Sequence, residues 1–293
     1  MTKRKIHHQF PRSTHDRFMA SISTQWEFSK NCREGVPLLA FHRIGKRPAY
    51  ANLPQLYVSP AHFLKLLDGF KRENLQSISI SEAIQTNAKI GSRFVISFDD
   101  GYEGALIYAA QTMREHGCSA IQFIVADRLG QRNEWDLGRD TAMERLMDRT
   151  QVQEWLSLGF EIGAHTLTHA KLPAIPIAAA KNEIAGSKKK LEDLFGIPVK
   201  HFAYPYGDYN DRIAELVREA GFETACTCDP EVVCHDVDPF RLGRFLIWDE
   251  TKVGRSMRFL TKALKKVGGP GLKRAILTLQ PAFRLSGKVS GDQ

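Results

Sequence analysis

The chain has 293 residues, 43% hydrophobic and 25% charged, which suits one barrel-sized soluble domain with tails. No apolar run approaches the roughly 18 residues of a membrane-spanning helix, and residues 1–25 lack the apolar stretch of a secretory signal. The net charge is +8, but residues 252–293 alone contribute +9, and no readout motif accompanies them, so no nucleic-acid partner is expected. We therefore expect a cytoplasmic protein whose main domain covers residues 36–250.

Residues 1–35 are basic, show no hydrophobic period and are expected to form a flexible extension. The main domain begins with an apolar strand over 36–41 that ends at His42. Ser59 and Pro60 then supply an N-cap and a first-turn proline for a helix. A short strand over 75–80 and a helix that opens at Ser81 follow.

Residues 94–98 are β-formers that lead into Asp99, Asp100 and Gly101, after which the apolar spacing is helical up to residue 116. Two adjacent carboxylates at the end of an apolar strand repel each other and lose hydration. They therefore need a cation or a hydrogen-bond network.

Histidines that could supply the other ligands of a cation follow later in the chain. After a strand over 120–125, a polar loop over 126–141 and a helix that stops at Gly159, a strand runs into His165 and His169. Two imidazoles four residues apart can bind one ion. With one carboxylate they form a three-ligand site with open positions, which is typical of catalytic zinc.

The rest of the main domain continues the alternation of helix and strand. A helix over 175–194, a strand over 199–204, a helix through 213–220 and strands over 222–226 and 240–248 are predicted. Strand and helix alternate at least six times, which favours an α/β fold of parallel βα units. Such folds place their chemistry at the C-terminal ends of the strands.

Residues 251–293 are predicted to form a basic amphipathic helical tail. Apolar residues recur there at helical spacing among ten Lys or Arg and one Asp. Residues 252–285 could lie on an anionic membrane surface, which would make the protein peripheral at the inner membrane. A helix packed on the main domain with a solvated basic face is the alternative.

The five cysteines are odd in number and lack framework spacing, which indicates a reducing compartment. Cys226, Cys228 and Cys234 with His235 could in principle bind zinc. Small buried or loop cysteines are the favoured interpretation. The set is Cys32, Cys118, Cys226, Cys228 and Cys234.

The motifs resemble those of the polysaccharide deacetylase family, the NodB-homology domain of carbohydrate esterase family 4. The first family motif, T/S-F-D-D-G, is matched by residues 97–101, and the second, H-S/T-x-x-H, by His165, Thr166 and His169. Residues 202–207, F-A-Y-P-Y-G, resemble the R-x-P-Y-G loop, as in a subgroup of exopolysaccharide deacetylases. Over residues 36–250 the resemblance implies a distorted (β/α) barrel of about seven parallel βα units.

The resemblance also implies roles for these residues. Asp100, His165 and His169 would bind a divalent metal, with zinc expected, Asp99 would act as general base, and the backbone N–H of Tyr206 would face the oxyanion. The implied reaction removes N-acetyl groups from N-acetylhexosamine units of a polysaccharide, an oligosaccharide or a lipid-linked glycan precursor.

Two departures from the family pattern stand out. Ala203 replaces the arginine that holds the catalytic Asp in many relatives, and we expect Arg244 to substitute for it. Alternatively, Arg241 or Arg244 pairs with surface acids.

The second departure concerns the late family histidine that protonates the leaving amine, because no histidine follows His235. Either His235 or His42 donates that proton, or Asp99 returns it, or the chain is a weak or inactive catalyst. His42 could equally be a strand-end residue bonded to backbone.

Two other functions remain open: hydrolysis of another C–N amide bond on the same fold, and a catalytically weak carbohydrate-binding or membrane-associated scaffold. Four aromatic residues near the expected rim could stack on sugar rings, although a packing role is the favoured interpretation for each one. They are Tyr102, Trp135, Tyr206 and Tyr209.

Overall fold

The computed structural model describes residues 35–86, 92–234 and 236–248. The predictions for the N-terminal extension, for the amphipathic tail and for His235 concern residues outside these ranges. None of the described helices is long and apolar enough to cross a membrane.

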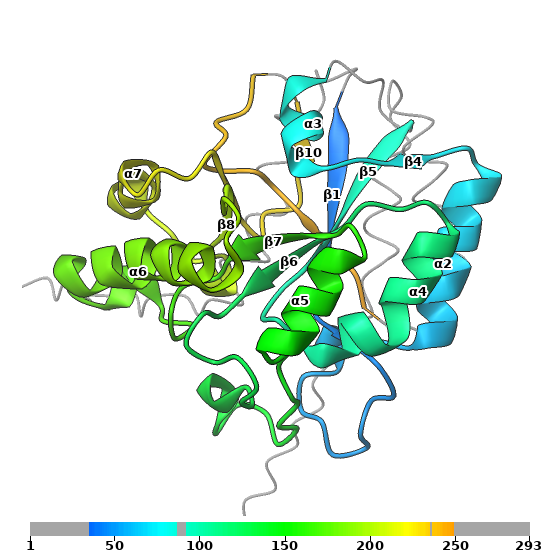
Figure 1. Ribbon diagram of the computed structural model, residues 1–293, viewed down its shortest axis with the longest axis horizontal. Coiled ribbons are helices and arrows are strands. Elements are labelled where there is room, and N and C mark those ends of the chain that lie inside the picture. The colour runs from blue at the N-terminus through cyan, green and yellow to red at the C-terminus, as the bar shows by residue number, and fades with distance from the viewer. Residues whose placement is uncertain (1–34, 87–91, 235, 249–293) are drawn as a thin grey trace, which may run out of the picture.

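A nine-stranded, curled sheet forms the centre of the fold (Figure 1). Its order is β10-β1-β5-β6-β7-β8-β9, with β4 beside β5 and β11 beside β1. All of these pairs are parallel except β1 with β10. The strands are β1 (Val36–Phe41), β2 (Arg43–Ile44), β3 (Tyr57–Val58), β4 (Gln76–Ser77), β5 (Arg93–Phe98), β6 (Ile121–Ile124), β7 (Glu161–Ala164), β8 (His201–Ala203), β9 (Thr224–Cys226), β10 (Val232–Val233) and β11 (Phe245–Leu246).

The sheet curls far enough to bring its last segment back to its first strand. A bridge between Cys226 and Leu242 joins β9 to the segment that leads into β11, and β11 pairs with β1. The α/β class and the barrel-like parallel sheet expected from the sequence are confirmed.

Helices cover the curled sheet from outside. In Figure 1, α2, α4 and α5 lie on one side of the strands, and α6 and α7 lie on the other. The helices are α2 (Pro60–Arg72), α3 (Ile80–Gln85), α4 (Gln111–Glu115), α5 (Arg149–Ser157), α6 (Ile177–Phe195) and α7 (Asp211–Glu219), with the short helical segments η3 (Pro54–Leu56), η4 (Ala105–Ala110), η5 (Glu134–Asp136), η6 (Leu172–Ala174) and η7 (Pro205–Gly207).

An aromatic cluster fixes β1 and β5 beneath the helices. Phe41 and Phe63 meet edge to face at 5.3 Å, and Phe98 meets Trp155 of α5 at 5.8 Å. In the strand register Phe41 is the partner of Phe98. The residues that follow, His42 and Asp99, therefore emerge at the same edge of the sheet.

Several element boundaries differ from the sequence prediction, and two of these differences have a clear physical cause. Ser79, not Ser81, precedes the first turn of α3 as its N-cap, because Ser79 and Glu82 form a reciprocal capping box, worth about 1 kcal/mol. The strand predicted over 240–248 shrinks to β11, because the Arg244 N–H donates to the Asp229 carbonyl rather than to a neighbouring strand.

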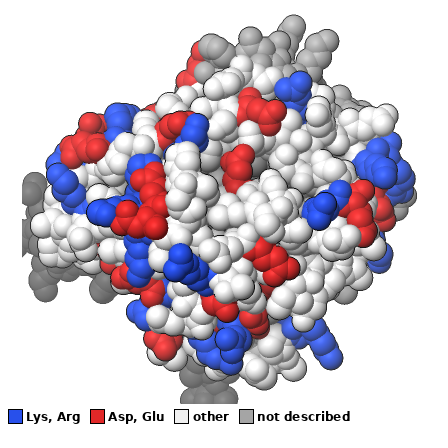
Figure 2. All heavy atoms as spheres, viewed as in Figure 1, with Lys and Arg blue, Asp and Glu red and all other residues white. Residues whose placement is uncertain are grey.

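The described surface mixes charges of both signs. Figure 2 shows basic and acidic side chains interspersed over the visible face. On α6 this reflects ion pairs one turn apart, such as Lys188 with Glu192 at 2.8 Å.

Candidate active site

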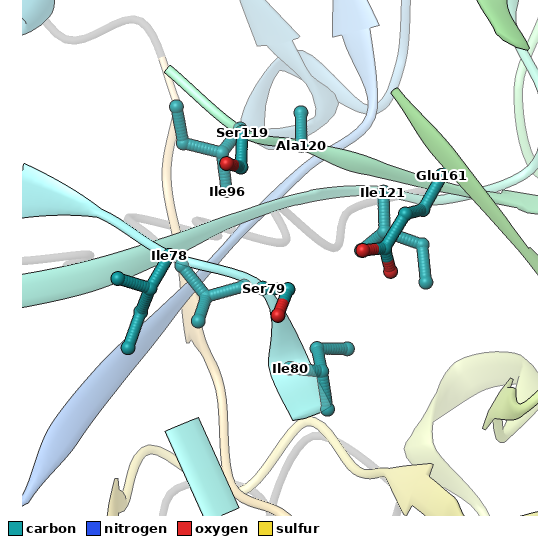
Figure 3. Close-up of a pocket in the computed structure, with 9 residues that line it drawn as sticks. Ile78, Ser79, Ile80, Ile96, Ser119, Ala120, Ile121 and Glu161 are labelled. Carbon is teal, nitrogen blue, oxygen red and sulfur yellow. The ribbon is translucent and has the colours of Figure 1, made fainter. Parts of the chain in front are cut away.

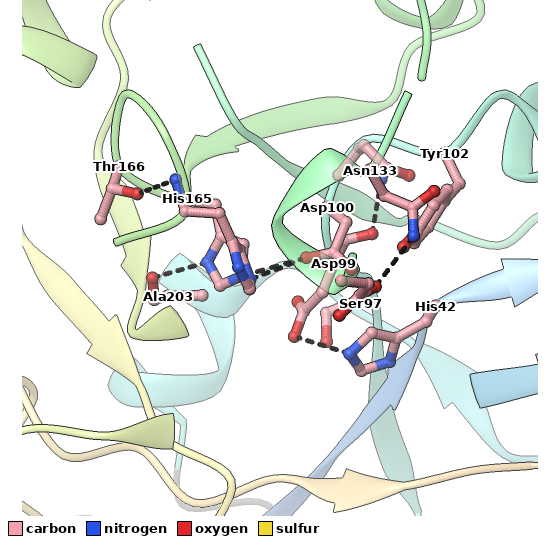
Figure 4. A network of polar contacts seen from close by, with 12 residues as sticks. His42, Ser97, Asp99, Asp100, Tyr102, Asn133, His165, Thr166 and Ala203 are labelled. Carbon is pink, nitrogen blue, oxygen red and sulfur yellow. Dashed lines mark hydrogen bonds and ion pairs between the residues drawn. The ribbon is translucent and has the colours of Figure 1, made fainter. Parts of the chain in front are cut away.

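Asp100, His165 and His169 meet at the carboxyl ends of β5 and β7. Figure 4 shows Asp100 and His165 facing each other. The Nε2 atoms of His165 and His169 lie 3.3 and 3.2 Å from Oδ1 of Asp100. Ligands about 2.1 Å from a tetrahedral zinc stand roughly 3.4 Å apart. Both distances to Oδ1 of Asp100 therefore match the edge length of such a site, and all three ligand atoms lie within 4.8 Å of one another.

The hydrogen bonds around these residues leave the ligand atoms available. Nδ1 of His165 lies 2.7 Å from the Ala203 carbonyl, which assigns the ring proton to Nδ1 and leaves the Nε2 lone pair free. Oδ1 of Asp100 is buried without a hydrogen-bond partner among the described residues. A buried carboxylate oxygen in that state is costly unless a cation meets it, so the three residues fit a divalent metal.

The protonation states also suit metal binding. Burial raises the pKa of Asp100, but His169 and His165 more than offset this and hold that pKa well below its usual range. Burial lowers the pKa of His169 despite the neighbouring Asp100. An ionised carboxylate and a neutral imidazole are the forms that bind a metal.

The backbone is unusual at the same residues. Five non-glycine residues in the described ranges have positive φ, and four lie in the site: Asp100, Thr166, His169 and Tyr206, with φ between 61° and 73°. Left-handed backbone at non-glycine residues costs about 1–3 kcal/mol each and gathers at functional sites. This clustering points to the site independently of the side-chain chemistry.

Glu183 of α6 fixes the turn between the two histidines. Its carboxylate accepts hydrogen bonds from the N–H groups of Leu167 and Thr168, both at 2.9 Å, and from the Thr168 hydroxyl at 2.7 Å. The Thr166 hydroxyl in turn accepts from the His169 N–H. Sequence reasoning missed Glu183, since nothing distinguishes it from the other acids of this helix.

Asp99 lies beside the three candidate metal ligands, Asp100, His165 and His169, and is held by Arg244. The guanidinium contacts both carboxylate oxygens, Nη1 to Oδ1 at 2.6 Å and Nη2 to Oδ2 at 2.7 Å. Burial raises the pKa of Asp99, but Arg244 and His42 outweigh it, so the pKa is lowered overall. Arg241 instead pairs with Asp211 and Asp238, so of the two arginines considered, Arg244 is the one that reaches Asp99.

His42 faces Asp99 from the end of β1, with Nε2 3.9 Å from Oδ2 (Figure 4). Its Nδ1 is buried and has no hydrogen-bond partner among the described residues, which disfavours a strand-end histidine bonded to backbone. Burial lowers the pKa of His42. A neutral imidazole therefore stands beside Asp99, at a separation of 3.9 Å that is longer than a direct hydrogen bond.

Two of the four candidate aromatic residues lie at the site. Trp135 stacks on His169 with ring centroids 4.6 Å apart, and the Tyr206 ring meets His169 at 4.5 Å. Tyr209 stacks on Tyr204 instead. Tyr102 is 1% exposed, so its ring is not accessible to a sugar from the surface. The prediction that Tyr102 could stack on a sugar ring is therefore wrong for this conformation.

The other candidate features do not compete with this site. A cavity of about 10 Å³ lies near the N-terminal ends of β6 and β7 beside Glu161 (Figure 3), and it has room for one water at most. Among the described residues, Asp100, His165 and His169 form the one group suited to a metal. Cys226 and Cys228 are free, whereas Cys234 is disulfide-bonded, contrary to the expectation of reduced cysteines throughout.

Comparisons with known proteins agree with these motifs. The family model for polysaccharide deacetylases matches residues 87–225. A protein of Bacillus subtilis (strain 168) named as the polysaccharide deacetylase YxkH is 24% identical over 150 residues, which cover 51% of this chain and 50% of that protein. The chain therefore spans half the length of this relative.

Two further proteins are similar over longer stretches. The poly-beta-1,6-N-acetyl-D-glucosamine N-deacetylase of Staphylococcus aureus (strain MSSA476) is 23% identical over 72% of this chain and 78% of its own. The crystal structure of a polysaccharide deacetylase from Bacillus cereus superposes with a TM-score of 0.64 and 24% identity, covering 76% of this chain and 67% of that chain. The likeness to the solved structure shows the shared fold.

Proposed function

Because this chain carries a polysaccharide deacetylase domain, we propose that it is a metal-dependent hydrolase that removes N-acetyl groups from N-acetylhexosamine units of a glycan. The observation that carries this proposal is the pair of adjacent aspartates in two different environments. Asp100 faces two imidazoles, and Asp99 faces a guanidinium. One carboxylate is thus suited to hold a metal and the other to move a proton.

Asp100, His165 and His169 are the proposed metal ligands, with zinc favoured by the two nitrogen ligands and one oxygen ligand. A bound divalent metal would supply Lewis acidity to the acetyl carbonyl and to an attacking water. The His165 ring would be kept in the ligating tautomer by the Ala203 carbonyl.

Asp99 is the proposed general base. Arg244 fixes both carboxylate oxygens, so the rotamer of Asp99 is set before substrate arrives. Asp99 accepts a proton from the attacking water, and His42 is proposed to help deliver a proton to the leaving nitrogen. The products are acetate and a free amine, which accounts for the oxygen and protons of the water.

Tyr206 is proposed to stabilise the oxyanion through its backbone N–H. Its left-handed conformation, with φ 61° and ψ 5°, turns the peptide inside η7 away from regular helix geometry. The N–H groups of the next two residues are engaged by the carbonyls of Tyr204 and Pro205. A preorganised backbone donor of this kind is worth several kcal/mol in acyl transfer.

The proposed substrate is an oligomer of N-acetylglucosamine, as the named activity of the Staphylococcus aureus relative suggests. A lipid-linked glycan precursor is the second source of the same acetamido sugar. Hydrolysis of a different amide and a catalytically weak scaffold are the outcomes that the test must separate.

The test is acetate release from β-1,6-linked N-acetylglucosamine oligomers by the zinc-loaded protein. Wild type should release acetate, and Asp99→Asn should reduce kcat by at least about 100-fold. Asp127→Asn, in a surface pair with Lys190, is the matched control and should stay active. Metal binding without acetate release from any glycan would favour the scaffold.

We also propose that residues 252–285 bring the protein to an anionic membrane surface, on the evidence of their basic, amphipathic sequence. Pelleting with phosphatidylglycerol vesicles should fall on removal of residues 252–293. Equal pelleting of the two proteins would rule this out.

A further inference from the structure

One irregular segment, residues 133–144, forms part of the wall of the candidate site. It places Trp135 on the ring of His169 and the Arg139 guanidinium 5.1 Å from the centre of the Tyr206 ring. The segment thus contacts a proposed metal ligand and the residue proposed for the oxyanion. Apart from η5, it contains no helix, so something other than a helical ladder must fix its position.

Arg43 binds this segment through two of its aspartates, Asp136 and Asp140. Its Nη1 lies 2.6 Å from Oδ2 of Asp140, and its Nη2 lies 3.1 Å from Oδ2 of Asp136. The same two nitrogens also donate to the hydroxyls of Tyr57 and Tyr102, both at 3.0 Å. One guanidinium therefore joins the segment to β3 and to the turn after Asp100.

The charged groups in this cluster are buried, and both carboxylates are hydrogen-bonded. Arg43, Asp136 and Asp140 are 2–4% exposed. Asp136 also accepts from the Asn133 amide, and Asp140 accepts from the N–H groups of Asn52 and Ala142. Buried charges with this many partners resist any rearrangement that would leave one of them unpaired.

Within the described part of the chain, the Arg43 side chain bonds to Tyr57, Tyr102, Asp136 and Asp140, and to neither a proposed metal ligand nor Asp99. The residue before it, His42, approaches Asp99, while Arg43 is directed to Asp136 and Asp140. Its influence on the site must therefore pass through the segment that carries Trp135.

We propose that Arg43 is a positioning residue that sets Trp135 against His169 and so fixes the wall of the substrate site. The role in catalysis rests on the deacetylase function proposed above, whereas the placement of Trp135 does not. Removal of Arg43 should free Trp135 and weaken substrate engagement while leaving the three metal ligands in place.

The first test measures the placement of Trp135 without any substrate. Acrylamide quenching of tryptophan fluorescence is compared between each protein and its Trp135→Phe counterpart, which isolates Trp135 from the other three tryptophans. Arg43→Met should make Trp135 more accessible to acrylamide. Arg212→Met, which removes an exposed arginine paired with Glu219, is the matched control and should change nothing.

The second test is a double-mutant cycle on kcat/KM with the zinc-loaded enzyme and N-acetylglucosamine oligomers. Arg43→Met and Trp135→Ala should each lower kcat/KM on the order of 10- to 100-fold, chiefly through KM for Trp135→Ala. The double variant should be no worse than the worse single variant, because both remove the same wall. Zinc stoichiometry, measured by calorimetry, should stay unchanged.

Two results would overturn the proposal. One is a double variant whose loss in kcat/KM equals the product of the two single losses, and the other is unchanged access of acrylamide to Trp135 in a folded Arg43→Met protein. If Arg43→Met does not fold, Arg43→Lys and Asp140→Asn each remove part of the same cluster, and unchanged Trp135 access in both overturns it equally. If wild type releases no acetate, the proposed function fails, and the fluorescence result still decides whether Arg43 positions Trp135.

Discussion

The guanidinium of Arg244 donates two hydrogen bonds, of 2.6 and 2.7 Å, to the carboxylate of Asp99, which lies 145 residues earlier in the chain. Arg244 also donates from Nε to the Thr227 carbonyl and from Nη1 to the Ser97 hydroxyl. Its side chain is 0% exposed and that of Asp99 is 3% exposed. The arginine next to β11 thus makes the contact with Asp99 that the resemblance expects of an arginine at residue 203.

Arg244→Met should destabilise the fold, because it leaves the buried Asp99 charge without its partner. Loss of one member of a buried ion pair costs about 3–5 kcal/mol. Urea unfolding followed by circular dichroism measures the change. Arg241→Met, which removes a more exposed arginine next to the same strand, should cost less than about 1 kcal/mol.

A double variant isolates the pair itself. Asp99→Asn combined with Arg244→Met removes both charges, so the double variant should be more stable than the sum of the single losses predicts. Strictly additive losses would show that the two side chains do not depend on each other.

His42→Gln should lower kcat by about 100-fold or more, since the imidazole near Asp99 would no longer relay a proton. KM and the affinity for zinc should remain unchanged, because His42 is not one of the three proposed metal ligands. Steady-state acetate release measures kcat and KM. His116→Gln removes a histidine that pairs with Asp68 at the surface, and an equal loss in that control would remove the assigned role of His42.

Glu183→Gln should weaken zinc binding about 10- to 100-fold, the usual cost of losing a residue that orients a metal ligand. The carboxylate supports two N–H groups in the turn between His165 and His169, and the amide can replace only part of that. Competition with a chromogenic chelator measures the affinity. Asp193→Ala on the same helix is the control, and identical affinities in all three proteins would contradict this account of the turn.

His201 should make stability depend on pH below neutrality. Burial lowers its pKa from 6.5 to about 4, so the folded protein binds this proton less readily than the unfolded chain. The contribution of neutral His201 to the free energy of unfolding is therefore complete above pH 6.5. It is lost as the pH falls from 6.5 toward 4, and the loss is on the order of 3 kcal/mol.

His201→Gln tests this pH dependence. Thermal or urea unfolding at pH 7 and pH 4 should show a smaller loss of stability in His201→Gln than in wild type, because the other titrating groups are common to both. The same loss in both proteins would mean that His201 does not resist protonation in the fold.

Local sequence was sufficient to predict those site residues that belong to motifs of neighbouring residues. The apolar strand into Asp99 and Asp100 and the close spacing of His165 and His169 predicted which groups the fold would bring together. The order of helices and strands also followed from local periodicity, and the structure confirms the α/β class predicted from it. These features need only neighbouring residues to be recognised.

Contacts between distant residues could not be predicted in the same way. Arg43 meets Asp136 and Asp140, which lie 93 and 97 residues away, and no spacing rule links them. Glu183 is one acid among several on α6 until the turn at Thr168 docks on it. The two-residue β10 strand is too short to give a periodic signal.

The most direct measurement is the metal content of the purified protein, by inductively coupled plasma mass spectrometry after equilibration with zinc and desalting. Wild type and Asp99→Asn should each retain one zinc per chain, whereas His165→Ala, folded by circular dichroism, should retain none. Equal zinc in wild type and His165→Ala, or none in wild type, would contradict the claim that Asp100, His165 and His169 hold a metal.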